Sequence, residues 1–411
     1  MSRNANQWTK RPDMPEGLYV DPRIYTDSEI FAEEKAKIFD KTWMVACHES
    51  EVAEPLDYRA YQHPGGHNLI VLRGEDGKIR VFQNICPHRG NRLLYDVAGS
   101  IKGSSPSGAP DRITCIFHAW SFDSKGSCVD ITRRKAGYQD RLKECDVDLR
   151  EVRCEVGYGG FVWVNMDDTA SDLSSHLAGA LDDLAPMLEE PMEVFHYHRA
   201  IVRGNYKMWH DTNSEFYHDY MHYHNRVTGM LKKEYWDREY VAYDHGHAKL
   251  TGMVLKYDAY EGQEQRTLAW PGMAPAGWEL VDLFPGITYN IRAPALRLDT
   301  SIPLGPNLLY IEFRGLGLKS DTPAERAIRV RDHNSIWGPF GRNLAEDLLG
   351  TSGQGTALND SSEAPYVLHG RLEDGKIHDE MGMRHFLEEW SRRMGRSSSD
   401  PLNRSVGLAA E

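Results

Sequence analysis

Two Cys-His pairs in the first third of the chain could hold a metal. Cys86-Pro-His88 supplies one thiolate and one imidazole, and Cys115-Ile-Phe-His118 supplies a second pair. Two thiolates and two imidazoles can ligate a [2Fe–2S] cluster in which cysteines hold one iron and histidines the other. The competing metal is zinc, because two cysteines and two histidines also form a tetrahedral structural site. Zinc fingers usually pair Cys with Cys and His with His, so the mixed pairs favour iron and sulfur.

A second group of potential ligands follows in a histidine-rich segment, which contains Asp211, Glu215, His218, His222 and His224. On an unbroken helix Glu215, His218 and His222 share one face, whereas His224 points about 120° away from His218. Two imidazoles and one carboxylate on iron(II) leave positions open for dioxygen. The alternative is a helix with solvated or hydrogen-bonded histidines, and the upstream Cys-His pairs favour the metal site.

The elements that must position the first group are mostly strands. Residues 41–170 contain short apolar runs, and the runs 68–72 and 78–82 flank a turn and predict a hairpin. Residues 99–111 are rich in Gly, Ser and Pro and predict a surface loop. We therefore expect an all-β domain over residues 41–170.

The flanking segments predict helices together with strands. Thr26 and Glu29 resemble a capping box, and a helix is expected over about 28–40 within an N-terminal arm, residues 1–40. Residues 177–188 read as a helix, 308–314 as a half-buried strand, and the apolar spacing of 383–394 as a core-facing helix. Residues 171–411 are accordingly expected to form an α+β domain against which the arm packs.

Composition excludes several other classes of protein. The chain has 411 residues, of which 40% are hydrophobic and 27% charged, and its formal net charge is −13. A negative protein repels a phosphate backbone, so we expect no nucleic-acid partner. No apolar run is long enough to span a bilayer and the N-terminus lacks a signal peptide, so we expect a cytoplasmic protein without membrane contact. Six cysteines are too few for a disulfide scaffold, which leaves some free to act as ligands.

The two pairs carry a family resemblance. Residues 86–90, Cys-Pro-His-Arg-Gly, and residues 115–120, Cys-Ile-Phe-His-Ala-Trp, resemble the Rieske domain of Rieske non-heme iron oxygenase large subunits. The resemblance implies a Rieske [2Fe–2S] cluster held by Cys86, His88, Cys115 and His118. It also implies a helix-grip-like α+β catalytic domain, built on an antiparallel sheet and holding a mononuclear Fe(II). The spacer between the pairs is longer than in most members and is similar to that of the methanesulfonate-oxidising branch.

The resemblance also assigns roles in the histidine-rich segment. Asp211 matches the acidic residue that precedes the motif, Glu215 the carboxylate that bridges the two metal centres, and His218 the first iron ligand. The family's usual second position falls on a tyrosine here. The second ligand is therefore either His222, as an unbroken helix prefers, or His224, as an irregular turn would permit.

The third iron ligand implied by the family is a distant aspartate. The sequence Glu346-Asp347, followed by Gln354-Gly355, is similar to the family element and nominates Asp347. Without the resemblance, this acidic pair would read as an ordinary solvated helix face.

The resemblance further implies the reaction and the partners. The expected enzyme takes electrons from NADH through a reductase, a ferredoxin or both, and uses O2 to hydroxylate methanesulfonate to formaldehyde and sulfite. A homotrimer is expected, with or without a small β subunit (α3β3). A sulfonate needs a cationic donor, and Arg226, Arg292 and Arg297 are candidates near the catalytic motifs, although for each of them a surface or structural ion-pair role is favoured over substrate binding.

Two other functions stay open at this stage. A ring-hydroxylating oxygenase that acts on an aromatic carboxylate would share both metal motifs and differ in the shape of its pocket. A non-catalytic Rieske electron carrier or a zinc-binding module would need no second iron, so the second histidine group argues against both.

Overall fold

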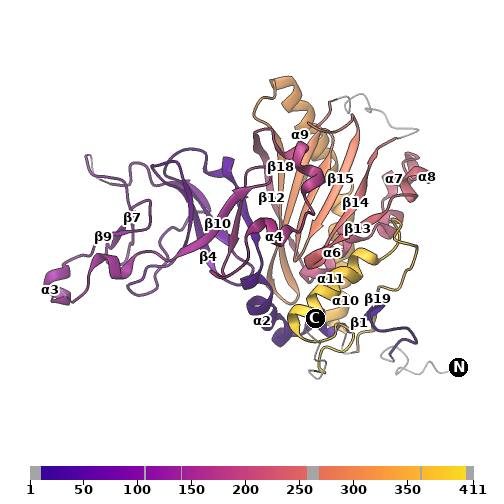
Figure 1. Ribbon diagram of the computed structural model, residues 1–411, viewed down its shortest axis with the longest axis horizontal. Coiled ribbons are helices and arrows are strands. Elements are labelled where there is room, and N and C mark those ends of the chain that lie inside the picture. The colour runs from indigo at the N-terminus through magenta and orange to yellow at the C-terminus, as the bar shows by residue number, and fades with distance from the viewer. Residues whose placement is uncertain (1–10, 106–107, 140, 257–267, 362, 404–411) are drawn as a thin grey trace. The chain divides into compact units, whose positions relative to one another are not determined.

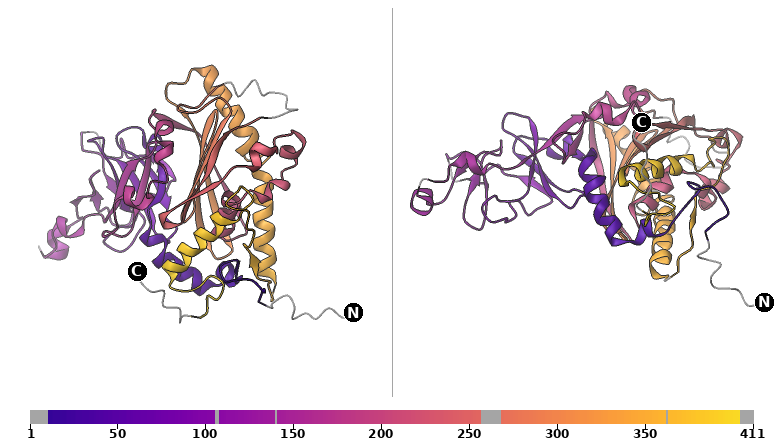
Figure 2. Two further views of the ribbon diagram at one scale, coloured as in Figure 1. Left: turned by 45° about the vertical axis from the view of Figure 1, so that its right-hand side comes forward. Right: turned by 60° about the horizontal axis from the view of Figure 1, so that its bottom comes forward.

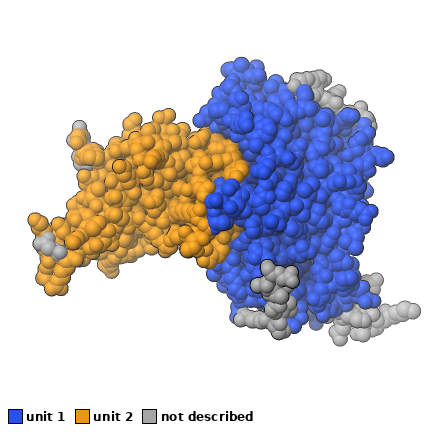
Figure 3. Space-filling view, in the orientation of Figure 1, with its two compact units in different colours: residues 1–39, 171–411 blue, residues 40–170 orange. Residues whose placement is uncertain are grey.

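The computed structural model divides the chain into two compact units, which Figure 3 colours separately. One unit is formed by residues 40–170, and the other by residues 1–39 together with residues 171–411. The structure describes residues 11–403 except 106–107, 140, 257–267 and 362. The N-terminal end of the predicted arm and part of the predicted 99–111 loop therefore lie outside the described residues.

Unit 40–170 is built on antiparallel strands, as the sequence predicted (Figure 1). Its seven-stranded sheet has the order β2-β11-β10-β5-β4-β3-β6, and a three-stranded sheet has the order β7-β8-β9. The strands are β2 (Met44–His48), β3 (Asp57–Gln62), β4 (Asn68–Arg73), β5 (Ile79–Gln83), β6 (Ala98–Ser100), β7 (Ile113–Thr114), β8 (Ser121–Phe122), β9 (Cys128–Asp130), β10 (Glu151–Gly157) and β11 (Phe161–Asn165). The helices are η3 (Glu49–Val52), α3 (Arg134–Tyr138) and η4 (Glu144–Val147).

In this unit the predicted hairpin is confirmed, whereas the predicted surface loop needs a correction. Strands β4 and β5 pair in register from Leu69 opposite Gln83 to Arg73 opposite Ile79, which confirms the hairpin. The predicted surface loop is wrong at its start, because β6 pairs with β3 and places Gly99 opposite Tyr58. A Cβ at Gly99 would lie 3.0 Å from the Tyr58 hydroxyl, so the missing side chain permits this close pairing.

The larger unit contains a second antiparallel sheet of seven strands, which is visible from two further directions in Figure 2. Its order is β12-β18-β17-β16-β15-β14-β13. The strands are β12 (Met192–Val202), β13 (Tyr240–Tyr243), β14 (His247–Val254), β15 (Gly277–Leu283), β16 (Ile287–Arg292), β17 (Ala295–Gly305) and β18 (Leu308–Leu318), and a separate pair is β1 (Tyr19–Val20) with β19 (Val367–Leu368). β18 includes the strand predicted over 308–314, but its residues from Ile311 onwards are buried on both faces, so the expected half-burial is wrong. The antiparallel α+β architecture is confirmed.

Helices pack against this sheet at several points, with α6 contacting β15 and β17, α9 contacting β17 and β18, and α11 contacting β13 and β14. The helices of the unit are α1 (Arg23–Thr26), α2 (Ser28–Lys37), η2 (Phe39–Lys41), α4 (Leu173–Leu177), η5 (Asp182–Leu184), α5 (Ala185–Leu188), α6 (Tyr206–Ser214), η6 (Tyr217–Tyr220), α7 (Tyr223–Val227), α8 (Lys233–Trp236), η7 (Asp244–Gly246), α9 (Pro323–Trp337), α10 (Leu344–Asp360) and α11 (Met381–Met394), although η2 runs into the smaller unit. In the part of the chain that is described, none of these helices has the length and apolar character needed to cross a bilayer.

Two helix predictions need correction and one is confirmed. The N-cap of α2 is Asp27 rather than Thr26, and its carboxylate accepts the N–H groups of Glu29 and Ile30. The single helix expected over 177–188 is three short helices, because Ala178 adopts the left-handed conformation with φ 48° and ends α4. α11 buries Trp390 and the other apolar residues of its predicted face.

The N-terminal helix is anchored to the larger unit by a buried ion pair. Lys207 of α6 donates from Nζ to Oε1 of Glu34 on α2 at 2.6 Å, and both side chains are buried. Trp390 of α11 donates from Nε1 to the same oxygen at 2.6 Å. A buried charge must be paired to be tolerated, so these bonds fix α2 against α6 and α11.

Candidate metal centres and substrate pocket

The two Cys-His pairs lie on two loops of similar construction. Cys86 follows β5, and Cys115 lies between β7 and β8. The Cys86 N–H donates to the carbonyl of Asn91 at 2.7 Å, and the Cys115 N–H donates to the carbonyl of Trp120 at 2.8 Å. Each cysteine therefore closes its own loop through the backbone, and the sulfur of Cys115 also accepts from Nδ2 of Asn91 at 3.8 Å.

The four side chains differ in exposure in a way that suits electron exchange. The thiols of Cys86 and Cys115 are buried, whereas the rings of His88 and His118 are half-exposed and lie 4.6 Å apart between centroids. His88 stacks on Trp120 at 4.5 Å. Burial raises the pKa of the Cys86 thiol, and nearby Cys115 adds to the rise. A metal that takes these sulfurs as thiolates must displace their protons, as the ligands of a [2Fe-2S] cluster require.

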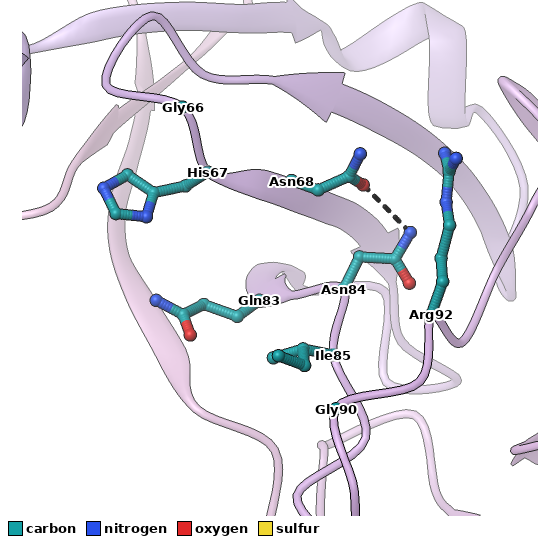
Figure 4. Close-up of a pocket in the computed structure, with 8 residues that line it drawn as sticks. All are labelled: Gly66, His67, Asn68, Gln83, Asn84, Ile85, Gly90 and Arg92. Carbon is teal, nitrogen blue, oxygen red and sulfur yellow. Dashed lines mark hydrogen bonds between the residues drawn. The ribbon is translucent and has the colours of Figure 1, made fainter.

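The side chain of Asn84 holds the first ligand loop, the one that carries Cys86 and His88. Its Oδ1 accepts the N–H groups of Leu93 and Leu94, and its Nδ2 donates to Oδ1 of Asn68 at 3.0 Å. Figure 4 shows this last bond at the edge of a cavity of about 290 Å³, which His67 and Arg92 also line. The return segment of the loop is thus tied to the β4–β5 hairpin.

The second candidate centre begins where α6 ends. Ser214 closes that helix, and its hydroxyl donates to Oδ2 of Asp282 on β15 at 2.7 Å. The next residue, Glu215, has an extended backbone (φ −143°, ψ 148°). His222 is likewise extended (φ −70°, ψ 97°) between η6 and α7. Of the two arrangements left open for this segment, the structure shows the irregular turn, and the chain leaves the helix where Ser214 is bonded to the sheet.

Despite the break, His218, His222 and Asp347 converge. Their ligand atoms lie within 4.8 Å of one another. His222 Nε2 is 3.2 Å and His218 Nε2 3.7 Å from Oδ1 of Asp347. This oxygen is buried, and no described residue gives it a well-directed hydrogen bond. Two imidazole nitrogens and a carboxylate oxygen facing a common point match the facial triad that holds iron(II).

The opposite nitrogen of each imidazole is held by a carboxylate. His218 Nδ1 lies 2.9 Å from Oε1 of Glu215, and His222 Nδ1 lies 2.7 Å from Oε2 of Glu346. Such partners fix the ring orientation and the tautomer that leaves Nε2 free for a metal.

The charge of the cluster suits a divalent ion. Burial disfavours the charged form of His218, but Glu215 and Asp347 outweigh burial and raise its pKa to about 10. Burial also disfavours the charged form of His222, but Asp347 outweighs burial and raises the pKa of His222. With a pKa of about 10, the His218 ring is positively charged near neutral pH when no metal is bound, and a divalent cation would take the place of that charge.

Two of the predicted site residues lie outside this cluster. His224 is in α7 and is not part of the group, so the structure brings together His222 and not His224. Asp211 is buried in α6, where burial and then the charge of Glu215 raise its pKa well above the usual range. Glu215 contacts His218 as expected. The other contact predicted for Glu215, to a histidine of the Rieske cluster, would be made to a neighbouring chain.

A narrow cavity of about 30 Å³ opens onto the cluster. It is lined by the three candidate ligands, by the apolar side chains of Phe216, Met230, Trp278, Leu280 and Trp337, and by the polar side chains of Thr212, Asn213, Asp219, Asn225, Asn290, Arg292 and Asn343. The volume holds about two water molecules and is far below that of clefts for drug-sized ligands. The pocket as it stands therefore favours a very small substrate.

The comparisons with known proteins agree with this geometry. Residues 42–148 match the Rieske [2Fe-2S] domain family. The chain is 52% identical over 402 residues to the methanesulfonate monooxygenase hydroxylase subunit alpha of Methylosulfonomonas methylovora, and the match covers 97% of each protein. The chain belongs to the Rieske oxygenase alpha subunits. It is therefore an oxygenase that carries a Rieske [2Fe-2S] cluster and a mononuclear non-heme iron.

Two further relatives extend the match. The 2-aminobenzenesulfonate 2,3-dioxygenase subunit alpha of Alcaligenes sp is 40% identical over 405 residues, covering 97% of this chain and 99% of the relative. The structure of a naphthalene 1,2-dioxygenase with indole bound shares the fold at 19% identity, with a TM-score of 0.77 and coverage of 98% and 100%. The fold of this Rieske oxygenase subunit is thus that of the family over nearly its whole length.

Sequence reasoning did not identify every residue at the site. Glu346 was noted only as the neighbour of Asp347, yet it holds His222. Asn225 and Asn343 line the cavity but carry no motif. The only local signal for Glu346 was its place in the acidic pair. Neighbouring residues on a helix point in different directions, so one carboxylate of such a pair can bind a metal while the other supports a ligand.

Proposed function

We propose that this subunit is the oxygenase component of an enzyme that hydroxylates methanesulfonate at its methyl group. Methanesulfonate, dioxygen, NADH and one proton become hydroxymethanesulfonate, NAD⁺ and water. The carbon–sulfur bond of hydroxymethanesulfonate then breaks to give formaldehyde and bisulfite. The observation that carries this proposal is the 52% identity, over 97% of the chain, to a methanesulfonate monooxygenase hydroxylase subunit, and the narrow cavity beside His218, His222 and Asp347 agrees with a small substrate.

Residue roles follow from the two clusters. Cys86, His88, Cys115 and His118 hold the Rieske cluster, and His218, His222 and Asp347 hold the mononuclear iron. The iron supplies the dioxygen chemistry that no side chain can perform. The chain's own residues orient these ligands, since Glu215 and Glu346 hold the two imidazoles. Trp278 and Leu280 line the apolar part of the cavity and limit the water beside the substrate.

Electrons reach the cluster from NADH through a reductase, a ferredoxin or both. We infer a homotrimer, with or without a small β subunit, in which the Rieske unit of one chain serves the iron of its neighbour. Glu215 would then bridge His218 and a cluster histidine of that neighbour. A supply of NADH and the free cysteines fit the cytoplasm.

The alternatives have less support. A ring-hydroxylating enzyme for aromatic carboxylates is less supported, because the two relatives that match 97% of this chain are named for sulfonate substrates. An electron carrier or a zinc module would not need the group of His218, His222 and Asp347. An aromatic sulfonate is a second candidate substrate, because the relative that is 40% identical is a 2-aminobenzenesulfonate dioxygenase subunit.

Product analysis tests the proposed function. Purified holoenzyme with a reductase, NADH and O2 is expected to release sulfite and formaldehyde from methanesulfonate in step with oxygen uptake. Metal analysis should find about three irons per chain. Oxidation of 2-aminobenzenesulfonate or benzoate without oxidation of methanesulfonate would contradict the proposal.

A further inference from the structure

An indole N–H fixes the orientation of one amide in the wall of the cavity beside the candidate iron site. Nε1 of Trp278 donates to Oδ1 of Asn290 at 3.0 Å, and both side chains are buried and line the cavity. An indole nitrogen can only donate, so it must face the oxygen of the amide and not its NH2 group. Nδ2 of Asn290 is therefore the part that remains for a ligand, and it has no hydrogen-bond partner among the described residues.

Other polar side chains of the cavity wall use their donors within the protein. The hydroxyl of Thr212 and Nδ2 of Asn213 both donate to the carbonyl of Trp209, at 2.8 Å and 3.4 Å. Nδ2 of Asn225 donates to a neighbouring carboxylate at 3.3 Å, which leaves the oxygen of that amide towards the cavity. Asn290 differs from these three residues because its donor is the end that is left over.

The arginines near the catalytic motifs are placed or engaged otherwise. Arg297 is buried in an ion pair with Asp299, with 2.7 Å between Nε and Oδ1, and Arg226 is exposed on α7; neither is among the lining residues. Arg292 lines the cavity, but it already has an interaction partner within the protein. A neutral amide is therefore the donor that this wall leaves for an anion.

The surroundings of Asn290 suit an anion that also reaches the metal cluster. The guanidinium carbon of Arg238 lies 4.4 Å from the centre of the Trp278 ring, so a positive charge stands beside the indole that holds the amide. The ring of Phe216 contacts both Trp278, at 5.5 Å between centroids, and His218, at 5.8 Å. These aromatic contacts join the wall that carries the amide to the wall that carries the first candidate ligand.

We propose that Asn290 binds a sulfonate oxygen of the substrate through its Nδ2 amide group. The inference rests on the proposed function and deepens it, because it assigns a residue that selects the sulfonate group. A hydrogen bond to an anion is charge-assisted and directional, so it holds the sulfonate in one orientation. Asn290 lines the same cavity of about 30 Å³ as His218, His222 and Asp347, so a sulfonate bound to the amide presents its short alkyl group to the cluster.

Binding measurements separate the amide donor from the hydrogen bond that orients it. Methanesulfonate is titrated by calorimetry into the purified holoenzyme and into the variants Asn290→Leu, Asn290→Asp and Trp278→Phe. Leucine removes the donor without adding charge, and we expect binding to weaken about 10- to 100-fold. Aspartate can still accept the Trp278 N–H but repels an anion, so we expect a loss of about 100-fold or more. Trp278→Phe, the matched control, removes the same internal bond and keeps the amide, so its loss should stay below about fivefold.

The outcomes distinguish a binding role from a structural one. The visible spectrum of the Rieske cluster, the iron content and the thermal midpoint establish that each variant is folded, and Asn290→Asp decides if Asn290→Leu does not fold. Wild-type affinity in a folded Asn290 variant overturns the proposal. A loss in Trp278→Phe as large as that in Asn290→Leu overturns it as well, because the amide would then act only by holding the indole.

A wild-type enzyme that does not bind methanesulfonate would separate this inference from the proposed function. The same titrations are then made with 2-aminobenzenesulfonate. Weaker binding by Asn290→Leu upholds the amide contact while the one-carbon function fails. Binding that Asn290→Leu leaves unchanged, or no binding by the wild type, rejects both.

Discussion

At the scale of single residues, the candidate iron site depends on groups that never touch the metal. Glu215 and Glu346 lie against the outer nitrogens of His218 and His222 at 2.9 Å and 2.7 Å. These carboxylates keep each ring in one tautomer and raise its basicity as a ligand. Asp347 alone would not select a metal, since an isolated carboxylate binds many cations weakly. The affinity of the site therefore depends on the whole set.

Removal of the Glu346 carboxylate should weaken iron binding while the ligands remain. In Glu346→Ala, His222 loses its Nδ1 partner, and we expect iron affinity to fall about 10- to 100-fold. Competition with a ferrous chelator measures this, and Glu190→Ala, an exposed glutamate, is the control. Equal iron affinity in the two variants would show that Glu346 does not support the ligand.

A buried histidine of the smaller unit should make that unit sensitive to acid. Burial, with a further effect of His67, lowers the pKa of His63 to about 3. Its Nδ1 accepts the N–H of Gly65 at 3.0 Å. A histidine whose pKa is depressed on folding contributes stability above pH 6.5, and this is lost as the pH falls towards 3.

The variant His63→Asn isolates this contribution, because the amide oxygen can still accept the Gly65 N–H. Between pH 7 and pH 4 we expect the wild type to lose on the order of 3 kcal/mol more unfolding free energy than the variant. Denaturant unfolding across that range measures the difference. Parallel curves would mean that His63 is protonated as easily in the folded protein as in the unfolded one.

At the scale of elements, the position of α10 decides where Asp347 lies. This helix passes close to the end of β12, and a Cβ at Gly355 would lie 2.3 Å from the carbonyl oxygen of Arg203 and 2.5 Å from Cα of Gly204. These are backbone atoms that cannot rotate away. The glycine therefore allows α10 to approach the connection from β12 to α6, and so brings Asp347 to the histidines that follow α6.

Adding a methyl group at Gly355 tests whether the close approach of α10 depends on the glycine. Gly355→Ala should push α10 outwards, destabilise the protein by about 1–3 kcal/mol and lower its iron content. The control is Gly353→Ala on the same helix, where a Cβ meets nothing within 4 Å. That change should be neutral or stabilising, because alanine favours a helix by up to about 1 kcal/mol. Unfolding free energies and iron analysis of both variants decide, and identical behaviour would reject the packing argument.

At the scale of the whole molecule, the two candidate centres belong to different compact units. Residues 86–118 lie within unit 40–170, whereas His218, His222 and Asp347 belong to the other unit. Electrons stored at one centre can therefore reach the other within a chain or between neighbouring chains. The proposed trimer uses the route between chains.

Mixed oligomers distinguish the two routes. Cys86→Ser, which lacks a cluster, and Asp347→Ala, which lacks the mononuclear iron, should each be inactive alone. Co-expressed in equal amounts they should recover about one quarter of wild-type turnover, the share of ring interfaces that join an intact cluster to an intact iron site. Sulfite release by the co-purified mixture measures this. Complete inactivity of mixtures shown to contain both chains would place the route within one chain.

By itself the sequence determined those features that arise within a few neighbouring residues. The spacing of the Cys-His pairs, the β4–β5 hairpin and the apolar face of α11 are all local. Each follows from chemistry or periodicity that neighbouring side chains already define. The choice of His218 and Asp347 needed the family pattern in addition, because nothing local distinguishes a ligand from a solvated side chain.

Only the tertiary structure decided which distant groups meet. An ideal helix puts Glu215, His218 and His222 on one face, yet the chain leaves the helix at Glu215 because Ser214 is bonded to Asp282 on another element. Glu346 and Arg292 reach the site from helix and strand positions that carry no local mark. Contacts across a fold depend on the packing of whole elements, and a packed interior allows only one arrangement of them. This packing brought His222 rather than His224 to Asp347.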